Sequence, residues 1–170
     1  MYWLDIPSNI MITGCNSNLL CQLIDSMDYS DIWVYTHSVD QVYPKTCQMI
    51  DNLTQFVGTI VSKQYVSDYL MVVIDGANLQ DLSSIRKLLH LSKTHDIIVI
   101  IRELETGTIM RLDQAFTMFI DYEIISRLTD QHIYGDLLHN REFNDVYQQL
   151  ADHESIVYDR RNLGMCVMTN

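Results

Sequence analysis

An aspartate at the end of an apolar run is the residue of this sequence best placed for chemistry. The run Tyr69-Leu-Met-Val-Val-Ile74 is uniformly apolar and ends abruptly at Asp75, Gly76 and Asn78. Its length and β-rich composition predict a strand buried on both faces, and open α/β sheets bind ligands at the carboxyl ends of such strands. A carboxylate at that place can hold magnesium beside a nucleotide. The alternative is that Asp75 caps the helix beginning near Asp81 or forms a turn with Gly76.

A second candidate site is the polar stretch after the first apolar segment. Residues 9–14 predict a short strand, and residues 19–27 carry apolar side chains at helical spacing. A strand, a polar turn and a helix begin a βα unit, and backbone N–H groups at a helix start can bind an anion. The candidate nucleotide-contacting residues are Gly14, Asn16, Ser17 and Asn18. The alternative is that this stretch forms an ordinary turn in which Ser17 or Asn18 caps the helix.

The elements that must position these residues alternate between strands and helices. The expected strands are 9–14, 31–37, 69–74, 96–102 and 116–122, and the expected helices are 19–27, 46–56, 82–92, 109–113 and 143–150. A closing hairpin pairs 155–158 with 165–168. Such alternation calls for a parallel sheet with right-handed crossovers. The sequence therefore predicts one α/β domain over residues 1–170, with a mainly parallel sheet, helices on both faces and a C-terminal β-hairpin.

Composition limits the classes of function. The formal charge of −11 argues against a broad basic surface, so nucleic acid would have to meet a local patch or a partner. The four cysteines and six histidines show no spacing typical of a metal site, and we expect reduced, mostly buried thiols. The N-terminus lacks the features of a signal peptide, and no stretch approaches the roughly twenty apolar residues of a membrane span. We expect a soluble, intracellular protein that does not enter membranes.

Taken in order, these segments resemble the poxvirus-type genome-packaging ATPases of large DNA viruses, within the FtsK/HerA group of P-loop motors. The resemblance covers nearly the whole chain and is one of pattern. Ile10-Met-Ile-Thr-Gly14 resembles the strand entering the phosphate loop, and Leu70-Met-Val-Val-Ile-Asp75 the Walker B strand. Asp96–Arg102 and Ile109–Phe116 resemble the strand ending in a polar sensor and the following Arg-x-Asn segment.

The resemblance implies a P-loop NTPase-like fold and a location in a host cell or virion. It also implies a magnesium ligand at Asp75 and, at Arg111, a leftover arginine finger or a contact to a neighbouring subunit. The alternative for Arg111 is an arginine on a solvated helix surface. These two are the residual candidates for catalytic residues.

The departures from the family pattern fall on the residues that carry the chemistry. A working phosphate loop needs G-x-x-x-x-G-K-[ST], but the stretch from Gly14 to Gln22 has no second glycine and no lysine. The acidic residue that orients the attacking water falls at Gly76, and the polar sensor falls at Arg102. Lys45-Thr46 mimics the end of such a loop only by coincidence, since no glycine precedes it. Phosphoryl transfer depends on positioning and charge stabilisation, so these losses predict a catalytically inactive relative.

Three hypotheses follow. The first is a non-catalytic pseudo-ATPase without ATP or magnesium, acting through a protein partner or self-association in virion assembly or with a motor. The second is an oligomeric packaging ATPase that binds ATP and magnesium through an unorthodox phosphate loop, with Arg111 acting in trans. The third is an intracellular α/β module that binds another protein. Magnesium-dependent nucleotide binding lost on mutating Asp75 would favour the second, and assembly into a ring would favour the first two.

Overall fold

A computed structural model describes residues 8–13, 17–27, 29, 31–38, 41–62, 70–104, 108, 111–112, 118–127, 137 and 139–169. The strands are β1 (Ile10–Thr13), β2 (Asp31–Thr36), β3 (Cys47–Met49), β4 (Leu70–Ala77), β5 (Ile97–Leu104), β6 (Tyr122–Ser126), β7 (Glu154–Asp159) and β8 (Gly164–Thr169). The helices are α1 (Ser17–Ser26), α2 (Leu53–Val61), the 3-10 helix η2 (Leu79–Asp81), α3 (Leu82–Ser92) and α6 (Arg141–Gln148).

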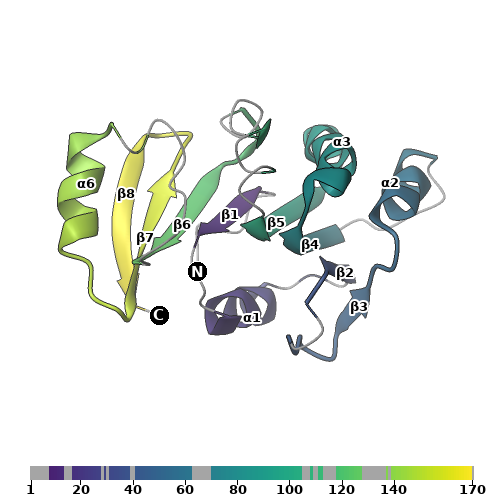
Figure 1. The fold of residues 1–170 in the computed structure, drawn as a ribbon, viewed down its shortest axis with the longest axis horizontal. Coiled ribbons are helices and arrows are strands. Elements are labelled where there is room, and N and C mark those ends of the chain that lie inside the picture. The colour runs from purple at the N-terminus through teal and green to yellow at the C-terminus, as the bar shows by residue number, and fades with distance from the viewer. Residues whose placement is uncertain are drawn as a thin grey trace.

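All eight strands belong to one sheet with the order β3-β2-β4-β5-β1-β6-β7-β8 (Figure 1). The pairs from β3 to β6 are parallel, whereas β6–β7 and β7–β8 are antiparallel. The predicted fold class, a mainly parallel sheet with a C-terminal hairpin, is therefore confirmed.

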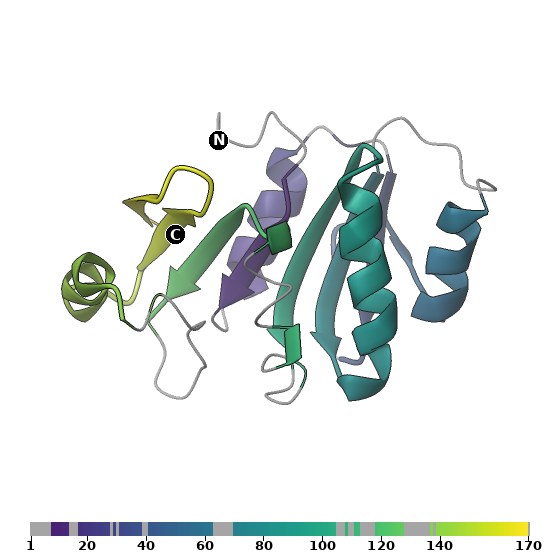
Figure 2. The same cartoon turned by 90° about the horizontal axis from the view of Figure 1, so that it is seen from above.

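Helices cover both faces of the sheet (Figure 2). The apolar side of α1 packs on one face, in a cluster that includes Leu20 and Val73, and α2 and α3 pack on the opposite face around Ile74. Phe143 of α6 packs against the hairpin residues Ile156 and Tyr158 in a third cluster. The central strand β4 is buried on both faces, as its unbroken apolar sequence predicts.

The register of the parallel strands brings four residues near the strands' carboxyl ends side by side at one edge of the sheet. Asp75 of β4 lies opposite Thr36 of β2 on one side and opposite Arg102 of β5 on the other. Arg102 in turn lies opposite Ile12 of β1. These are the carboxyl ends of the parallel strands, so the predicted location of the candidate site is the edge where β1, β2, β4 and β5 end together.

Two predicted elements are wrong. The segment 46–56 is not one helix, because β3 pairs with β2 and α2 begins only after Asn52, whose side chain accepts a hydrogen bond from the N–H of Gln55. The strand predicted at 116–122 instead begins at Tyr122, and residues 118–119 are helical. Of the short helix predicted at 109–113, Arg111 and Leu112 are helical, and its other residues lie outside the described part.

The cysteines are less buried than predicted. Among the described residues, Cys21 and Cys47 are half-buried and Cys166 is exposed, and all three are free thiols. Cys15 lies outside the described residues. No described helix is both long and apolar enough to cross a bilayer.

Candidate functional site

Asp75 and Arg102 form a buried ion pair where the family pattern places a magnesium ligand and a polar sensor. Arg102 Nε donates to Asp75 Oδ1 at 2.9 Å, and Arg102 Nη2 donates to Asp75 Oδ2 at 2.8 Å. Each side chain is only 2% exposed. Two parallel N–H···O bonds between a guanidinium and a carboxylate are the strongest form of this interaction, and burial removes the competition from water.

The connection from β2 to β3 closes over this pair. Tyr43 Oη donates to Asp75 Oδ2 at 2.6 Å, and Gln41 Oε1 lies 3.4 Å from Arg102 Nη2. Burial, followed by the hydrogen bond to Asp75, raises the pKa of the Tyr43 phenol. The neighbouring carbonyl of Val42 accepts a weak bond from the thiol of Cys21 on α1, at 3.6 Å. The segment 41–43 is thereby tied both to the ion pair and to the helix that follows the phosphate-loop position.

The donor set around Asp75 does not fit magnesium. Both carboxylate oxygens already accept hydrogen bonds from Arg102, and one accepts a further bond from Tyr43. Mg²⁺ requires near-octahedral oxygen ligation and retains several waters, which a site this buried does not provide. Two like unit charges about 4 Å apart repel by about 4 kcal/mol at an effective dielectric constant of ~20, and magnesium carries two charges. The guanidinium of Arg102 therefore takes the place of the metal ion as the counter-charge of Asp75.

The backbone next to Asp75 is also unsuited to the missing acidic residue. Gly76 has a φ of 79°, in the left-handed region that glycine adopts readily. A glutamate at this position would cost roughly 1–2 kcal/mol in backbone strain. The conformation at position 76 thus favours glycine over a residue with a side chain.

The structure does not gather the other predicted site residues around Asp75. Arg111 is exposed, and its carbonyl oxygen accepts a bond from Arg86 Nη2 at 2.9 Å. Asn18 is exposed in the first turn of α1, which begins at Ser17, so Asn18 does not precede the helix as a cap. Gly14 and Asn16 lie outside the described residues, as does the side chain of Ser17.

The alternative of a structural cap at Asp75 is wrong. The cap ahead of η2 and α3 is Asn78, whose side chain accepts from the N–H of Gln80 at 3.0 Å. Asp81 completes a capping box by accepting from the N–H of Asn78 at 3.2 Å. Asp75 is a partner of Arg102 instead, and pattern reading missed this pair because it depends on β4 and β5 being neighbours.

A second polar cluster lies at the same edge of the sheet, between β2 and η2. Tyr35 Oη donates to Asp81 Oδ1 at 2.8 Å and lies 3.1 Å from His37 Nε2, which is 3.0 Å from Asp81 Oδ2. Burial raises the pKa of Asp81, but bonds from His37, Tyr35 and the backbone of Asn78 outweigh it, so the net pKa is lowered. Burial and the bond to Asp81 raise the pKa of Tyr35 to about 12.

This cluster predicts a loss of stability at high pH. An unfolded tyrosine ionises near pH 10, whereas Tyr35 stays protonated in the folded state until about pH 12. The stability linked to Tyr35 is therefore complete below pH 10 and is lost as pH rises through 12. Urea unfolding between these pH values should show a smaller decline with pH for Tyr35→Phe than for the unmutated protein. Equal declines would contradict the assignment.

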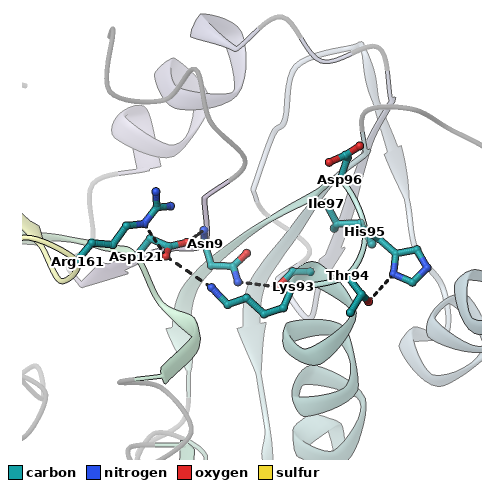
Figure 3. Close-up of a pocket in the computed structure, with 9 residues that line it drawn as sticks. Asn9, Lys93, Thr94, His95, Asp96, Ile97, Asp121 and Arg161 are labelled. Atoms are coloured by element: carbon teal, nitrogen blue, oxygen red, sulfur yellow. Dashed lines mark hydrogen bonds and ion pairs between the residues drawn. The ribbon is translucent and has the colours of Figure 1, made fainter.

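A hollow of about 550 Å³ opens at the opposite edge, near the amino ends of the parallel strands (Figure 3). Its polar centre is Asp121, whose Oδ1 accepts from Arg161 Nε at 2.8 Å and lies 3.6 Å from Lys93 Nζ. Asp121 Oδ2 accepts from the N–H of Asn9 at 2.8 Å. The nearest helix end is the carboxyl end of α3, which carries partial negative charge. Since the lining contains two acidic residues, Asp96 and Asp121, beside the two cations Lys93 and Arg161, the hollow is better explained as a structural junction than as an anion site.

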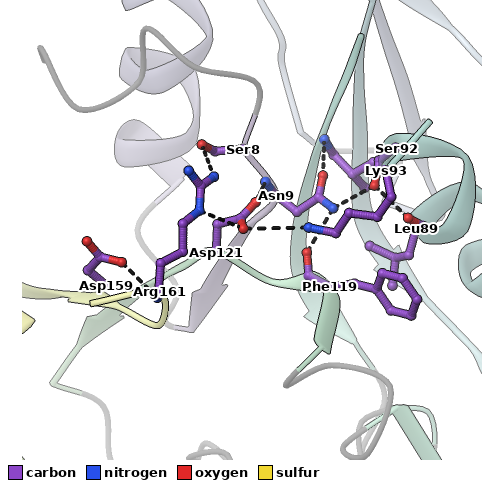
Figure 4. Close-up of polar contacts among 10 residues, drawn as sticks. Ser8, Asn9, Leu89, Ser92, Lys93, Phe119, Asp121, Asp159 and Arg161 are labelled. Carbon is purple, nitrogen blue, oxygen red and sulfur yellow. Dashed lines mark hydrogen bonds and ion pairs between the residues drawn. The ribbon is translucent and has the colours of Figure 1, made fainter. Parts of the chain in front are cut away.

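Asn9 is the hub of this junction (Figure 4). Its Nδ2 donates to Ser92 Oγ at 2.7 Å and to the carbonyl oxygen of Phe119 at 2.9 Å, and its Oδ1 accepts from the N–H of Val99 at 3.1 Å. One buried side chain thus joins the ends of α3, β5 and the segment before β6.

Among the described residues, no group of three or more His, Cys, Asp or Glu side chains could hold a metal ion.

Comparison with known proteins gives the fold. No protein-family profile matches the sequence, and no curated protein sequence matches it significantly. The DNA-packaging ATPase B204 of Sulfolobus Turreted Icosahedral Virus is similar in structure, with a TM-score of 0.63, 9% identity, and coverage of 97% of this chain and 98% of that chain.

Two further structures are similar. The genome-packaging NTPase B204 of Sulfolobus turreted icosahedral virus 2, in complex with AMPPCP, gives a TM-score of 0.61 at 11% identity, over 95% of this chain and 97% of that one. The cytoplasmic domain of the type VII secretion ATPase EccC of Thermomonospora curvata gives 0.58 at 10% identity, over 96% of this chain and 24% of that one. The resemblance seen in the sequence is confirmed at the level of structure: this chain has the fold of the viral genome-packaging ATPases.

Proposed function

We propose that this protein is a non-catalytic pseudo-ATPase that keeps the fold of a packaging ATPase and acts through its protein surfaces, in virion assembly or beside a motor. The observation that carries the proposal is the bidentate pair between Asp75 and Arg102, each 2% exposed. An ATPase of this fold needs its Walker B carboxylate free to face magnesium. Here the side chain of Arg102 donates hydrogen bonds to both oxygens of that carboxylate.

Two further features support the proposal. The sequence from Gly14 to Gln22 has no lysine to neutralise phosphate charge. Gly76 stands where the water-orienting acid is expected, with a backbone conformation that disfavours an acidic residue. The similar B204 protein was solved with AMPPCP, so the fold itself is compatible with nucleotide, and the loss proposed here rests on these few side chains.

The test is thermal unfolding with millimolar ATP, with and without magnesium, together with a hydrolysis assay. We expect no magnesium-dependent shift for the unmutated protein. In Arg102→Asn the carboxylate of Asp75 is released, and magnesium should stabilise that variant. A ligand at about one hundred times its dissociation constant adds about 2.7 kcal/mol, or roughly 2–4 °C for a domain of this size.

The control is the double variant Asp75→Asn with Arg102→Asn, which should lose the response to magnesium. Arg102→Gln provides a second single variant if the asparagine variant does not unfold cooperatively. A magnesium-dependent shift in the unmutated protein that disappears in Asp75→Ala would overturn the proposal and favour an ATPase. So would hydrolysis of ATP that the same substitution abolishes.

A further inference from the structure

We propose that a hollow beside β3, here called the outer hollow, binds an arginine side chain from a basic segment of a partner protein. The outer hollow measures about 480 Å³ and is lined by residues of β2, the end of β3, the turn that follows it and the first half of α2. Its apolar lining consists of Trp33, Met49, Ile50 and Phe56. The site makes no use of Asp75 or Arg102, so it stands or falls separately from the proposed loss of catalysis.

Trp33 gives the outer hollow an aromatic surface. Its side chain is half-buried, and its ring centroid lies 5.1 Å from that of Phe56, with the two ring planes inclined by 40°. Packing against Phe56 and the core cluster holds the indole in place where it borders the hollow. Tryptophan attracts a cation more strongly than the other aromatic side chains do, and a guanidinium also stacks on its ring. The hollow therefore suits a ligand with an apolar body and a flat cationic end.

The charge of the outer hollow is negative and is not matched by side chains of this protein. Asp51 lines the hollow, is exposed, and makes no hydrogen bond or ion pair with any residue that the structure describes. The described lining residues include no lysine, arginine or histidine. A second carboxylate, Asp31, lies on the same face of β2 as Trp33, two residues earlier. A cationic ligand is thus the electrostatic complement of this site.

The polar side chains of α2 add hydrogen-bond acceptors. Gln55 and Thr59 lie four residues apart, on the same side of the helix. The side chain of Gln55 has no hydrogen-bond partner in the described part of the chain, and Thr59 Oγ1 donates to the carbonyl oxygen of Phe56 at 2.6 Å, which leaves its lone pairs available. Guanidinium carries five N–H donors and no acceptor, so it complements such a lining better than an ammonium group does.

An anion is a poorer occupant, although the amino end of α2 borders the outer hollow. Asn52 caps that end, with its side chain accepting from the N–H of Gln55 at 2.9 Å. The helix dipole is equivalent to about half a positive charge, which is less than the full negative charge of Asp51. The net charge of −11 also favours encounter with a basic partner over an acidic one.

The experiment titrates a blocked tripeptide, with arginine at its centre and glycine on each side, into ¹⁵N-labelled protein at low ionic strength. The chain has two tryptophans, and Trp3→Phe assigns the indole N–H signal of Trp33. We expect a saturable shift of that signal with a millimolar dissociation constant, which rises as salt is added. The same tripeptide with citrulline has nearly the same shape without the charge, and it should bind at least about threefold more weakly.

Three variants locate the contact. Asp51→Asn should raise the dissociation constant about threefold, whereas Asp145→Asn, which changes the net charge equally at an exposed position of α6, should leave it unchanged. Gln55→Glu adds a carboxylate to the outer hollow and should tighten binding by a similar factor. Equal binding of the arginine and citrulline peptides, a Trp33 signal that does not move, or equal effects of the two asparagine variants would overturn the proposal. Tighter binding of the matching glutamate tripeptide would overturn it in favour of an anion site.

Discussion

Replacement of Asp75 by alanine is expected to lower the free energy of unfolding by about 3–5 kcal/mol. The change leaves the guanidinium of Arg102 buried without its carboxylate, and it also removes the acceptor of the Tyr43 hydroxyl. An unpaired charge in a low-dielectric interior costs far more than the pair contributes. In a working ATPase the same substitution would act mainly on hydrolysis, whereas here we expect it to act on stability, measured as the urea midpoint at constant m-value.

The control for this result removes both charges together. A double variant, Asp75→Leu with Arg102→Met, fills similar volume with apolar atoms and should recover most of the lost stability, because buried ion pairs replaced as a unit are often close to neutral. If Asp75→Ala shifts the urea midpoint no more than a typical surface substitution does, the buried pair described above is incorrect.

Replacement of Asn9 by alanine is expected to cost about 2–5 kcal/mol, because it leaves the N–H of Val99 and the carbonyl of Phe119 without their partner, at about 1–3 kcal/mol for each buried group. It also removes the bond to Ser92. The measurement is again urea unfolding. Asn18→Ala, an exposed asparagine of α1, is the matched control and should change stability by no more than about 0.5 kcal/mol.

A small effect of Asn9→Ala would mean that water or a backbone shift satisfies these groups. In that case the hollow at the amino edge would be more open to solvent than the contacts of Asn9 indicate. The junction would then contribute little to holding β5 and the start of β6 together.

The central strands were predictable because a strand buried on both faces of a sheet has an unbroken run of apolar residues. β4 and β5 are such runs, and Asp75 stands where the first of them meets the carboxyl edge. The C-terminal hairpin was equally clear from two short strands around a polar turn. In contrast, β3 has only three residues, too few to show any period, and its identity depends on pairing with β2.

β6 shows why a strand with a buried charged residue is hard to predict from the pattern of apolar residues. Its residue Glu123 is fully buried and accepts from Arg160 Nη2 at 2.9 Å, so a charged residue stands in the core where an apolar one is expected. The partner lies thirty-seven residues later in the chain. The apolar segment just before β6 then looked more like a strand than β6 itself. The same reason hid the pairing of Asp75 with Arg102, since both contacts are set by strand order rather than by local sequence.

The position of β1 inside the sheet has a consequence for how the protein is made. β1 is synthesised early, yet it pairs with β5 and β6, with Ile10 opposite Ile100 and Tyr122. Contacts so distant in sequence form late, because the entropy of closing the intervening chain is lost before they stabilise anything. Until residues up to about 126 have been made, β1 lacks β6, its neighbour on one side, and β1 itself has no paired strand before β5 is complete at Leu104. Nascent chains at this stage should be the form that most needs a chaperone and aggregates most readily.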